Sequence, residues 1–252
     1  MPLADPLAHT SHRPWPPPSA PWSWHQTWHH LLFAHWRVPA SVLRAHVPSR
    51  LSIDEHGGSA WLGLVPFTMT GVTLRGMPPL PWLSAFAEMN LRTYVTCDGK
   101  PGVWFLRMDC ARLAAVVGAR QHLGLPYVWS RMRVRVGANA IDYHSRRGDA
   151  VFDATYTPVG EPRTSEPGSL EAFLTERYCL YAIKAARMLR VNIHHRPWPL
   201  QRASAVIRRN SIPASLKLPD DGGERLLHFA RRIDVVGWPP EGCSDRKDRV
   251  RA

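Results

Sequence analysis

Polar and apolar residues alternate with a period of two over most of the middle of the chain, a pattern typical of β-strands. The pattern is clearest in residues 86–96, where every second position carries a polar group: Glu88, Asn90, Arg92 and Tyr94. Successive side chains of a strand point to opposite faces, so these four would share one face. They would form a site if that face lines a cavity. Otherwise they are a solvated surface or a ladder of structural salt bridges.

Turn sequences between the alternating segments predict a series of antiparallel hairpins. The expected strand pairs are 51–54 with 59–72, 86–96 with 102–109, 127–136 with 140–146, and 177–183 with 188–194. Further strands are expected at 28–36, 151–158 and 226–236. Strands therefore dominate the predicted structure.

Few segments have helical character. Residues 112–123 carry apolar residues at helical spacing, and Gly124 suits a C-terminal cap. Pro39 begins a short helical stretch at 39–46, and Ser169 is a typical N-terminal cap for another at 167–176. Two or three short helices among many hairpins predict a mainly β (α+β) domain with one antiparallel sheet system, closed or nearly closed. Such a sheet has an interior that can hold a ligand.

The two ends of the chain differ in composition from its middle. Residues 1–22 are rich in Pro, Ser and His, which predicts a disordered N-terminal segment. Residues 239–252 are charged without apolar periodicity, which predicts a C-terminal tail. We expect a single domain at 23–238. No apolar run is long enough to cross a bilayer, and the cysteines lack metal or redox spacing, so we expect a cytoplasmic protein without membrane contact.

The formal net charge is +12, and arginine supplies nearly all of the excess. This balance suggests nucleic acid, an anionic membrane surface or an acidic ligand as partner. The arginines are scattered, however, and no nucleic-acid-binding motif accompanies them, so an Arg-driven nucleic-acid binder is the weakest of our alternatives. Arg131, Arg133 and Arg135 alternate with apolar residues, which predicts a strand with a solvated basic face.

Motifs of the common enzyme chemistries are missing from the sequence. There is no Gly-x-Ser-x-Gly elbow, no His-Glu-x-x-His, and no phosphate- or dinucleotide-binding glycine loop. His25, His29, His30 and His35 crowd one segment, but no carboxylate lies nearby to complete a zinc site. We therefore expect no metal and no cofactor.

Several phrases of the sequence together resemble the YqjF-like family of uncharacterised bacterial proteins. Three long ones are Ala60-Trp-Leu-Gly-Leu-Val-Pro-Phe67, Glu88-Met-Asn-Leu-Arg-Thr-Tyr-Val95 and His194-His-Arg-Pro-Trp-Pro-Leu200, and the resemblance covers residues 24–238. That family is similar in turn to the acetoacetate decarboxylase superfamily, whose fold is a mainly antiparallel β-cone or barrel around an internal pocket. Decarboxylases of this fold place acidic and Arg side chains in the pocket. The resemblance thus favours an interior position for the Glu88 row.

The chain departs from the decarboxylases at the residues that carry their chemistry. Those enzymes have a Gly-Arg-Glu…Gly-x-Pro-Lys-Lys stretch, in which one lysine forms a Schiff base with the keto substrate and its neighbour lowers its pKa. The comparable stretch here is Gly118-Ala-Arg-Gln-His-Leu-Gly-Leu-Pro-Tyr-Val128, so Tyr127 and Val128 stand where the lysines would be. Neither can form an imine. Lys100 in a turn and Lys184 at a hairpin tip are no obvious substitutes.

The resemblance therefore implies a small-molecule-binding protein of the acetoacetate decarboxylase-like fold, acting on a small polar or carboxylated metabolite, with or without catalysis that needs no Schiff base. We expect Glu88 as the catalytic candidate or hydrogen-bond acceptor, Arg92 as the anion clamp and Asn90 as an orienting group. Tyr94 and Tyr127 complete the expected ligand-binding set. The alternative is a non-catalytic interaction scaffold of the same fold, in which the row holds strands together. A homo-oligomer is compatible with both hypotheses.

Overall fold

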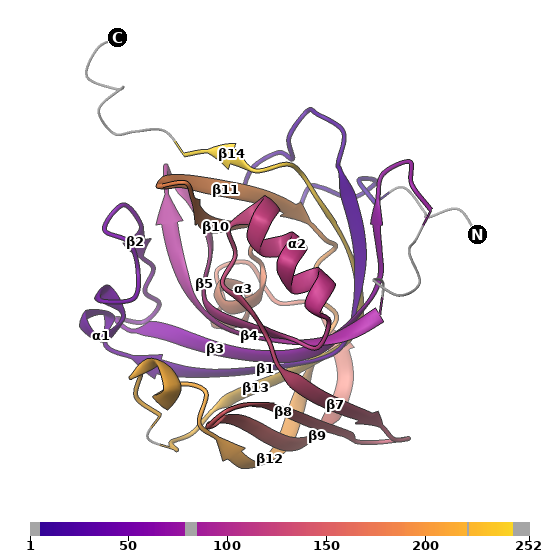
Figure 1. Cartoon of the computed structure of the whole chain (residues 1–252), viewed down its shortest axis with the longest axis vertical. Coiled ribbons are helices and arrows are strands. Elements are labelled where there is room, and N and C mark those ends of the chain that lie inside the picture. Colours follow the sequence, from indigo (N-terminus) through magenta and orange to yellow (C-terminus); the bar gives the residue numbers. More distant parts are fainter. Residues whose placement is uncertain (1–5, 79–84, 221, 244–252) are drawn as a thin grey trace.

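The structure, a computed structural model, describes residues 6–78, 85–220 and 222–243. The strands are β1 (Trp24–Val38), β2 (Ser52–Ile53), β3 (Ala60–Leu74), β4 (Ala85–Cys97), β5 (Lys100–Cys110), β6 (Tyr127–Trp129), β7 (Arg131–Val136), β8 (Ile141–Arg147), β9 (Ala150–Arg163), β10 (Cys179–Lys184), β11 (Arg187–His194), β12 (Leu200–Asn210), β13 (Leu226–Gly237) and β14 (Glu241–Gly242). The helices are α1 (Ala40–Arg44), α2 (Leu113–Leu123), α3 (Leu170–Thr175) and the short 3-10 helix η1 (Ala214–Leu216). The predicted mainly β class with a few short helices is confirmed (Figure 1).

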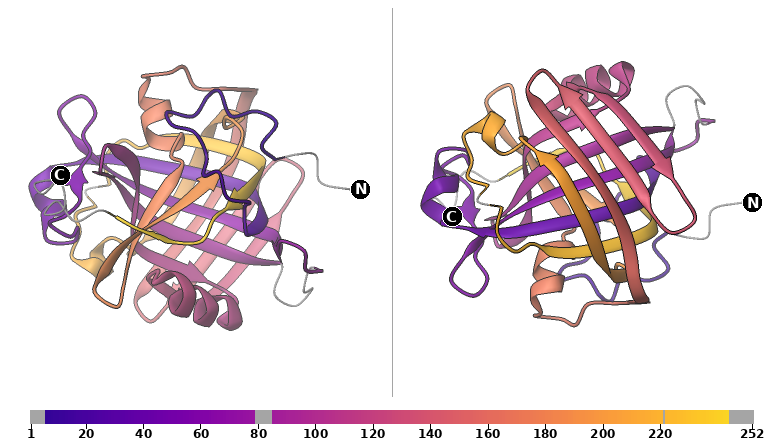
Figure 2. Two further views of the ribbon diagram at one scale, coloured as in Figure 1. Left: turned by 90° about the horizontal axis from the view of Figure 1, so that it is seen from above. Right: turned by 90° about the horizontal axis from the view of Figure 1, so that it is seen from below.

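Within the described residues, seven strands form a closed ring in the order β11, β10, β5, β4, β3, β1 and β13. The ring closes because β11 also pairs with β13, at Ile193 with Gly237 and at His194 with Val236. Its strand pairs are antiparallel except for the short parallel pairing of β10 with β5. The two views in Figure 2 show the long strands of the ring from opposite sides.

The strands β12, β9, β8 and β7 continue the sheet from β13 in that order and form a second layer outside the ring. In Figure 1 this layer lies beneath β1, β3 and β4. A large hydrophobic cluster joins the two layers, and it includes Leu64 of β3, Leu91 of β4, Tyr143 of β8 and Phe152 of β9. The hydroxyl of Tyr143 also donates to the main-chain oxygen of Glu88 at 2.6 Å. The second layer therefore seals the outer face of the ring at β3 and β4.

The strand β4 is consequently buried on both faces. Met89, Leu91 and Val95 belong to the cluster between the layers. The ring interior holds three smaller hydrophobic clusters, one with Phe33 and Trp198, one with Met108 and Tyr127, and one with Trp61 and Tyr94. Glu88, Asn90 and Arg92 alternate with the residues of the outer face and are also buried. The polar row of the sequence thus faces the interior of the ring.

The structure has the two helix caps that the sequence predicts, one at the end of α2 and one at the start of α3. Gly124 follows α2 with φ of 68°, a left-handed conformation that suits glycine. The side chain of Ser169 accepts a hydrogen bond from the main-chain nitrogen of Ala172 at 3.2 Å and caps α3. In Figure 1, α2 lies in front of the ring and α3 is seen behind it. None of the helices in the described residues has the length and apolar character needed to span a bilayer.

One predicted hairpin is wrong. The strand β2 does not pair with β3 but with the end of β4, at Ser52 with Thr96 and at Ile53 with Val95. The reason is Asp54, whose main-chain nitrogen donates to the carbonyl oxygen of Tyr94 at 2.9 Å and whose side chain accepts from Thr96 at 2.5 Å. These bonds hold the segment against β4.

Two further strands differ from expectation. The predicted strand 127–136 is divided at Ser130: β6 pairs in parallel with β5, and only β7 pairs with β8. Ser130 is buried, and its hydroxyl donates to Asp109 of β5, which explains the break. The strand β12 was not predicted. The exposed positions of Arg131, Arg133 and Arg135 agree with the predicted solvated face.

Both terminal segments contact the domain. In residues 6–22, which we expected to be disordered, Arg13 is only 8% exposed and donates to the carbonyl oxygen of Ile193 at 2.7 Å. At the other end, Glu241 of β14 accepts a hydrogen bond from Arg190 at 2.9 Å, within the segment predicted as a tail. Residues 1–5 and 244–252 lie outside the described residues, and the domain boundaries stay a prediction.

Candidate functional site

The polar row of β4 runs through the ring from the side of α2 to the side of α3. Glu88 contacts Tyr127, which follows α2 in the chain. Arg92 contacts the carbonyl oxygen of Leu174 in α3, at 3.0 Å. Asn90 lies between them. A straight strand with a period of two therefore brings the whole row to one interior wall.

Glu88 is the most perturbed acid of the row. It is 2% exposed, and its Oε2 accepts a hydrogen bond from the hydroxyl of Tyr127 at 2.7 Å. Burial raises the pKa of Glu88 to about 8, and the Tyr127 hydrogen bond opposes this only in part. Glu88 is therefore largely protonated at neutral pH and can donate as well as accept a proton. Glu88 and Tyr127 were both predicted as site residues. They lie 39 positions apart in the chain, and the structure brings them into contact.

Arg92 is a buried cation without a carboxylate partner among the described residues. One guanidinium nitrogen donates to Leu174, and the group lies 5.5 Å from the ring centre of Phe33 and 5.6 Å from that of Tyr94. The Nε of Arg92 and the Oδ1 of Asn90 have no hydrogen-bond partner within the described part of the chain. Buried polar atoms are normally satisfied, so these two are unusual.

A second buried arginine nearby, Arg177, does have a carboxylate partner. Arg177 lies 5.0 Å from the ring centre of Tyr94 and pairs with Asp54 at 2.8 Å. It is 6% exposed, so its burial is similar to that of Arg92. Arg92 therefore differs from Arg177 in having no carboxylate partner among the described residues.

Tyr94 closes the row, and its hydroxyl lies 2.6 Å from Nε2 of His35. His35 is fully buried, and burial lowers its pKa well below the ordinary value, so the imidazole is neutral. A Cβ at Gly63 would lie 2.8 Å from the His35 ring, so only glycine leaves room for this pair. Sequence reasoning considered His35 only as a metal ligand. His35 lies two residues from Phe33 and therefore shares its face of β1. This spacing was the signal that could have placed His35 beside the row.

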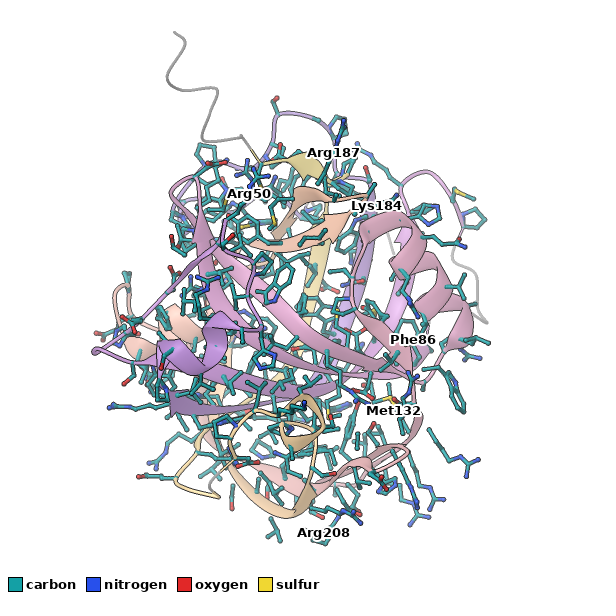
Figure 3. The ribbon with its side chains drawn as sticks, turned by 60° about the vertical axis from the view of Figure 1, so that its left-hand side comes forward. Arg50, Phe86, Met132, Lys184, Arg187 and Arg208 are labelled. Carbon is teal, nitrogen blue, oxygen red and sulfur yellow. The ribbon has the colours of Figure 1, made fainter. Side chains whose placement is uncertain are left out.

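The lysines of the described residues lie away from the row. Lys184 donates to the carbonyl oxygen of His122 at 3.3 Å and, with Arg187, marks the exposed tip of the hairpin formed by β10 and β11 (Figure 3). Lys100 lies 5.9 Å from the ring centre of Trp15 in the N-terminal segment. Lys217 follows η1 in a left-handed conformation. Within the part of the chain that the structure describes, no group of three or more His, Cys, Asp or Glu side chains is placed to hold a metal ion.

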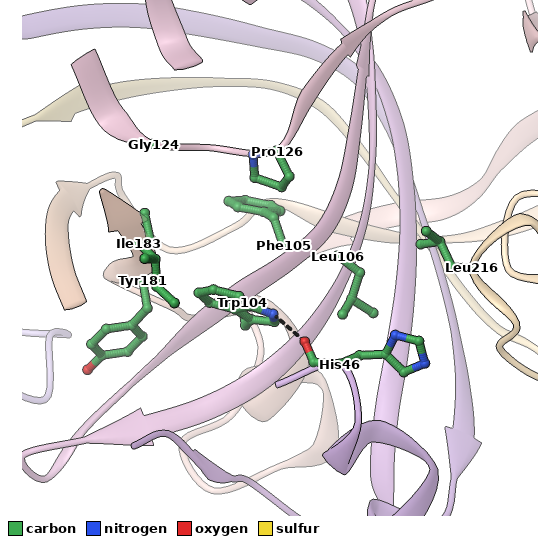
Figure 4. A pocket seen from close by; sticks show the side chains of 10 residues that line it. His46, Trp104, Phe105, Leu106, Gly124, Pro126, Tyr181, Ile183 and Leu216 are labelled. Atoms are coloured by element: carbon green, nitrogen blue, oxygen red, sulfur yellow. Dashed lines mark hydrogen bonds between the residues drawn. The ribbon is translucent and has the colours of Figure 1, made fainter. Parts of the chain in front are cut away.

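Two adjoining cavities lie outside the row, beside β5. The first has a volume of about 320 Å³, and it is lined by His46, Trp104, Phe105, Leu106, Gly124, Pro126, Tyr181, Ala182, Ile183 and Leu216 (Figure 4). The second has a volume of about 470 Å³ and shares Leu106, Gly124, Pro126 and Leu216 with the first. Tyr127 lies in the wall of the second cavity. The partner of Glu88 is therefore also a cavity residue.

Comparison with known proteins places the chain in a family. The family model DUF2071, described as an uncharacterized conserved protein, matches residues 25–234. The chain belongs to the DUF2071 family. A relative in this family group, the uncharacterized protein YqjF of Bacillus subtilis (strain 168), is 43% identical over 225 residues, which cover 88% of this chain and 93% of YqjF. The predicted resemblance to YqjF-like proteins is confirmed.

Solved structures show what fold this DUF2071 protein has. The enduracididine biosynthesis enzyme MppR complexed with pyruvate aligns with a TM-score of 0.62 and 13% identity, covering 90% of this chain and 92% of MppR. Acetoacetate decarboxylase from Legionella pneumophila aligns with a TM-score of 0.62 and 12% identity, covering 94% of each chain. The acetoacetate decarboxylase-like fold expected from the sequence is thus confirmed.

Proposed function

We propose that this DUF2071 protein binds a small carboxylated molecule inside the ring, with the carboxylate at Arg92 and the rest of the molecule facing Asn90 and the Glu88–Tyr127 pair. The observation that carries the proposal is the state of Arg92. A guanidinium buried in the ring has no carboxylate partner among the described residues, whereas Arg177 beside it has Asp54.

Electrostatics explains why this arrangement favours an anionic ligand. An isolated buried charge is costly, and a bound carboxylate offsets that cost with charge-assisted hydrogen bonds. The free Nε of Arg92 and the free Oδ1 of Asn90 supply one further donor and one acceptor on the same wall. A molecule that carries both a carboxylate and a hydrogen-bond donor satisfies both atoms.

Glu88 supports a second use of the same site, which is proton transfer. With a pKa of about 8, this carboxyl exchanges its proton close to neutral pH, the range in which acid–base catalysis is efficient. The proposed chemistry involves no covalent step. None of the lysines described above contacts the Glu88 row, and the resemblance to the decarboxylases puts Tyr127 and Val128 where those enzymes carry their two lysines.

The structural neighbours support the size and charge of the ligand. One is described as complexed with pyruvate, and another is named for acetoacetate. Both compounds are small keto acids. A small carboxylate is therefore the ligand class to test first.

The test is calorimetric titration of the purified protein with pyruvate, acetoacetate and propionate. We expect at least one of them to bind to the wild type. Replacing Arg92 by Gln should weaken binding about tenfold to a hundredfold, because hydrogen bonds to a charged group are worth about 1.5–3 kcal/mol. Absence of binding by these three acids and by longer straight-chain acids would refute the proposal.

The matched control is Arg37→Gln. Arg37 is an exposed residue of β1 that lies over the ring of Trp61 at 5.3 Å, outside the row. The control variant loses the same charge and should keep wild-type affinity. If both variants lost affinity equally, the effect would come from net charge and not from Arg92.

A further inference from the structure

The ring has an opening at the edge of β5 that faces away from β4. On that edge, β10 pairs with β5 only at Val103 and Trp104, and β6 pairs with it only from Met108 onwards. Residues 105–107 therefore have no strand neighbour on this side within the described part of the chain. The two cavities beside β5 lie at this opening.

The first cavity is lined from both faces of the sheet. Phe105 and Ala182 in the first cavity belong to the interior side, where they pack with Met108 and Tyr127. Trp104 and Leu106 in the same cavity pack against the cluster between the layers. Residues of both faces of the sheet therefore line the same cavity.

A bulge in β5 shapes the opening. Leu91 of β4 pairs with Arg107, and the next residue, Arg92, pairs with Phe105, so Leu106 has no partner on β4. Phe105 and Met108 both keep interior positions as a result. Directly opposed residues have their Cβ atoms about 5 Å apart, so Phe105, which lines the first cavity, is an immediate neighbour of Arg92.

We infer that the opening beside β5, between its pairings with β10 and β6, is a second part of the ligand site, which takes an aliphatic chain while the carboxylate of the same molecule lies at Arg92. The inference rests on the proposed function and narrows its ligand class to medium-chain aliphatic acids.

The walls of the first cavity match such a chain. Trp104, Phe105, Pro126 and Ile183 are aromatic or apolar, and the indole nitrogen of Trp104 donates to the carbonyl oxygen of His46 at 3.0 Å (Figure 4). This bond satisfies the polar atom of Trp104 and fixes its ring as a wall. A volume of about 320 Å³ lies at the lower end of the range of small-molecule sites.

The experiment is calorimetric titration with straight-chain carboxylic acids from propionate to decanoate. In the wild type, affinity should rise about threefold to fourfold with each added methylene, because burying one methylene stabilises binding by about 0.8 kcal/mol. The rise should stop when the cavity is filled. Replacing Ile183 by Trp fills the first cavity from its outer wall, where Ile183 is 42% exposed. This variant should bind propionate as the wild type does and show no dependence on chain length.

The matched control is Val206→Trp in β12, which adds the same side chain at a position that is 64% exposed and lines neither cavity. It should keep the wild-type dependence on chain length. A second readout uses acids with a terminal bromine, which quench a tryptophan they touch. Quenching should fall when Trp104 is replaced by Phe.

The outcomes separate the two hypotheses. Binding of short acids without any dependence on chain length would overturn the inference and leave the proposed function standing. The same would hold if Ile183→Trp kept the full chain-length dependence. If no acid of any length bound, both would be refuted.

Discussion

A single carboxyl, Glu88, links the stability of this protein to pH. Its pKa is about 8 in the folded protein and 4.5 when unperturbed, because burial disfavours the charged form. Below pH 4.5 the group is protonated in both states and has no effect. Between these values the unfolded chain loses the proton while the folded protein keeps it, so the free energy of unfolding falls as pH rises. Above pH 8 the loss is complete and constant.

Replacing Glu88 by Gln should remove this dependence and keep an acceptor for Tyr127. We expect the variant to be more stable than the wild type at pH 9, by up to about 5 kcal/mol, and close to it at pH 4. Urea denaturation at both pH values measures the difference. Glu161→Gln, at an exposed position, is the control and should shift neither curve. Equal stability of wild type and Glu88→Gln at pH 9 would show that Glu88 is not buried as a neutral acid.

The sequence predicted the shared interior face of the polar row better than the partners of its side chains. Glu88, Asn90 and Arg92 could be read as one wall because a strand has a fixed period and the row contains no break. The choice of Tyr127 as a pocket residue depended on the family resemblance, and its hydrogen bond to Glu88 was not predicted. His35 was missed as a partner of Tyr94, because nothing local in β1 shows that Gly63 of β3 leaves space for an imidazole.

At the scale of elements, the N-terminal segment acts as part of the domain. Arg13 lies 4.6 Å from the ring centre of Tyr178 and donates to Ile193 at the point where β11 meets β13. Burial lowers the pKa of Arg13 to about 10. Composition alone predicted disorder, because a Pro-rich segment has no periodicity that reveals a docked arginine.

Replacing Arg13 by Ala should therefore lower the free energy of unfolding by about 2 kcal/mol, the value of a buried hydrogen bond from a charged donor. Chemical denaturation followed by tryptophan fluorescence gives the number. Arg133→Ala, on the solvated face of β7, is the matched control and should change stability by less than about 0.5 kcal/mol. If the two variants behaved alike, the segment would contribute nothing to the fold.

The missed strand β12 shows the limit of hydrophobic patterns. Its inward residues include Ala203, Ala205 and Ile207, which pack against the cluster between the layers. Two of these are too small to give a clear apolar period, and arginines occupy many of the other positions. Larger apolar residues at regular spacing occur in β4, in β5 and in the hairpin of β10 with β11. These strands were predicted.

At the scale of the molecule, closure of the ring depends on very few residues. Gly237 pairs with Trp24 of β1 and with Ile193 of β11, so it stands where the two ends of the ring meet. A Cβ at this position would lie 1.9 Å from the Trp24 ring. That distance is far inside van der Waals contact, and the half-buried ring of Trp24, which packs against the cluster of Phe33 and Trp198, cannot move away without cost.

We predict that Gly237→Ala destabilises the protein by about 3 kcal/mol, at the upper end of the usual cost of overpacking. Hydrogen exchange should show the largest loss of protection in β11 and the end of β13. The control is Gly242→Ala, because a Cβ there has no atom within 4 Å. Uniform loss of protection over all strands would show that closure is not a local event.

The burial of β4 on both faces has a consequence for protein engineering. Even-numbered positions from 88 to 94 face the ring interior, and their neighbours Met89, Leu91 and Val95 belong to the cluster between the layers. A mutant library that varies only the even positions would probe the proposed ligand site, and one that varies only the odd positions would probe the packing between the layers. The two faces can therefore be varied separately within the same eight residues of chain.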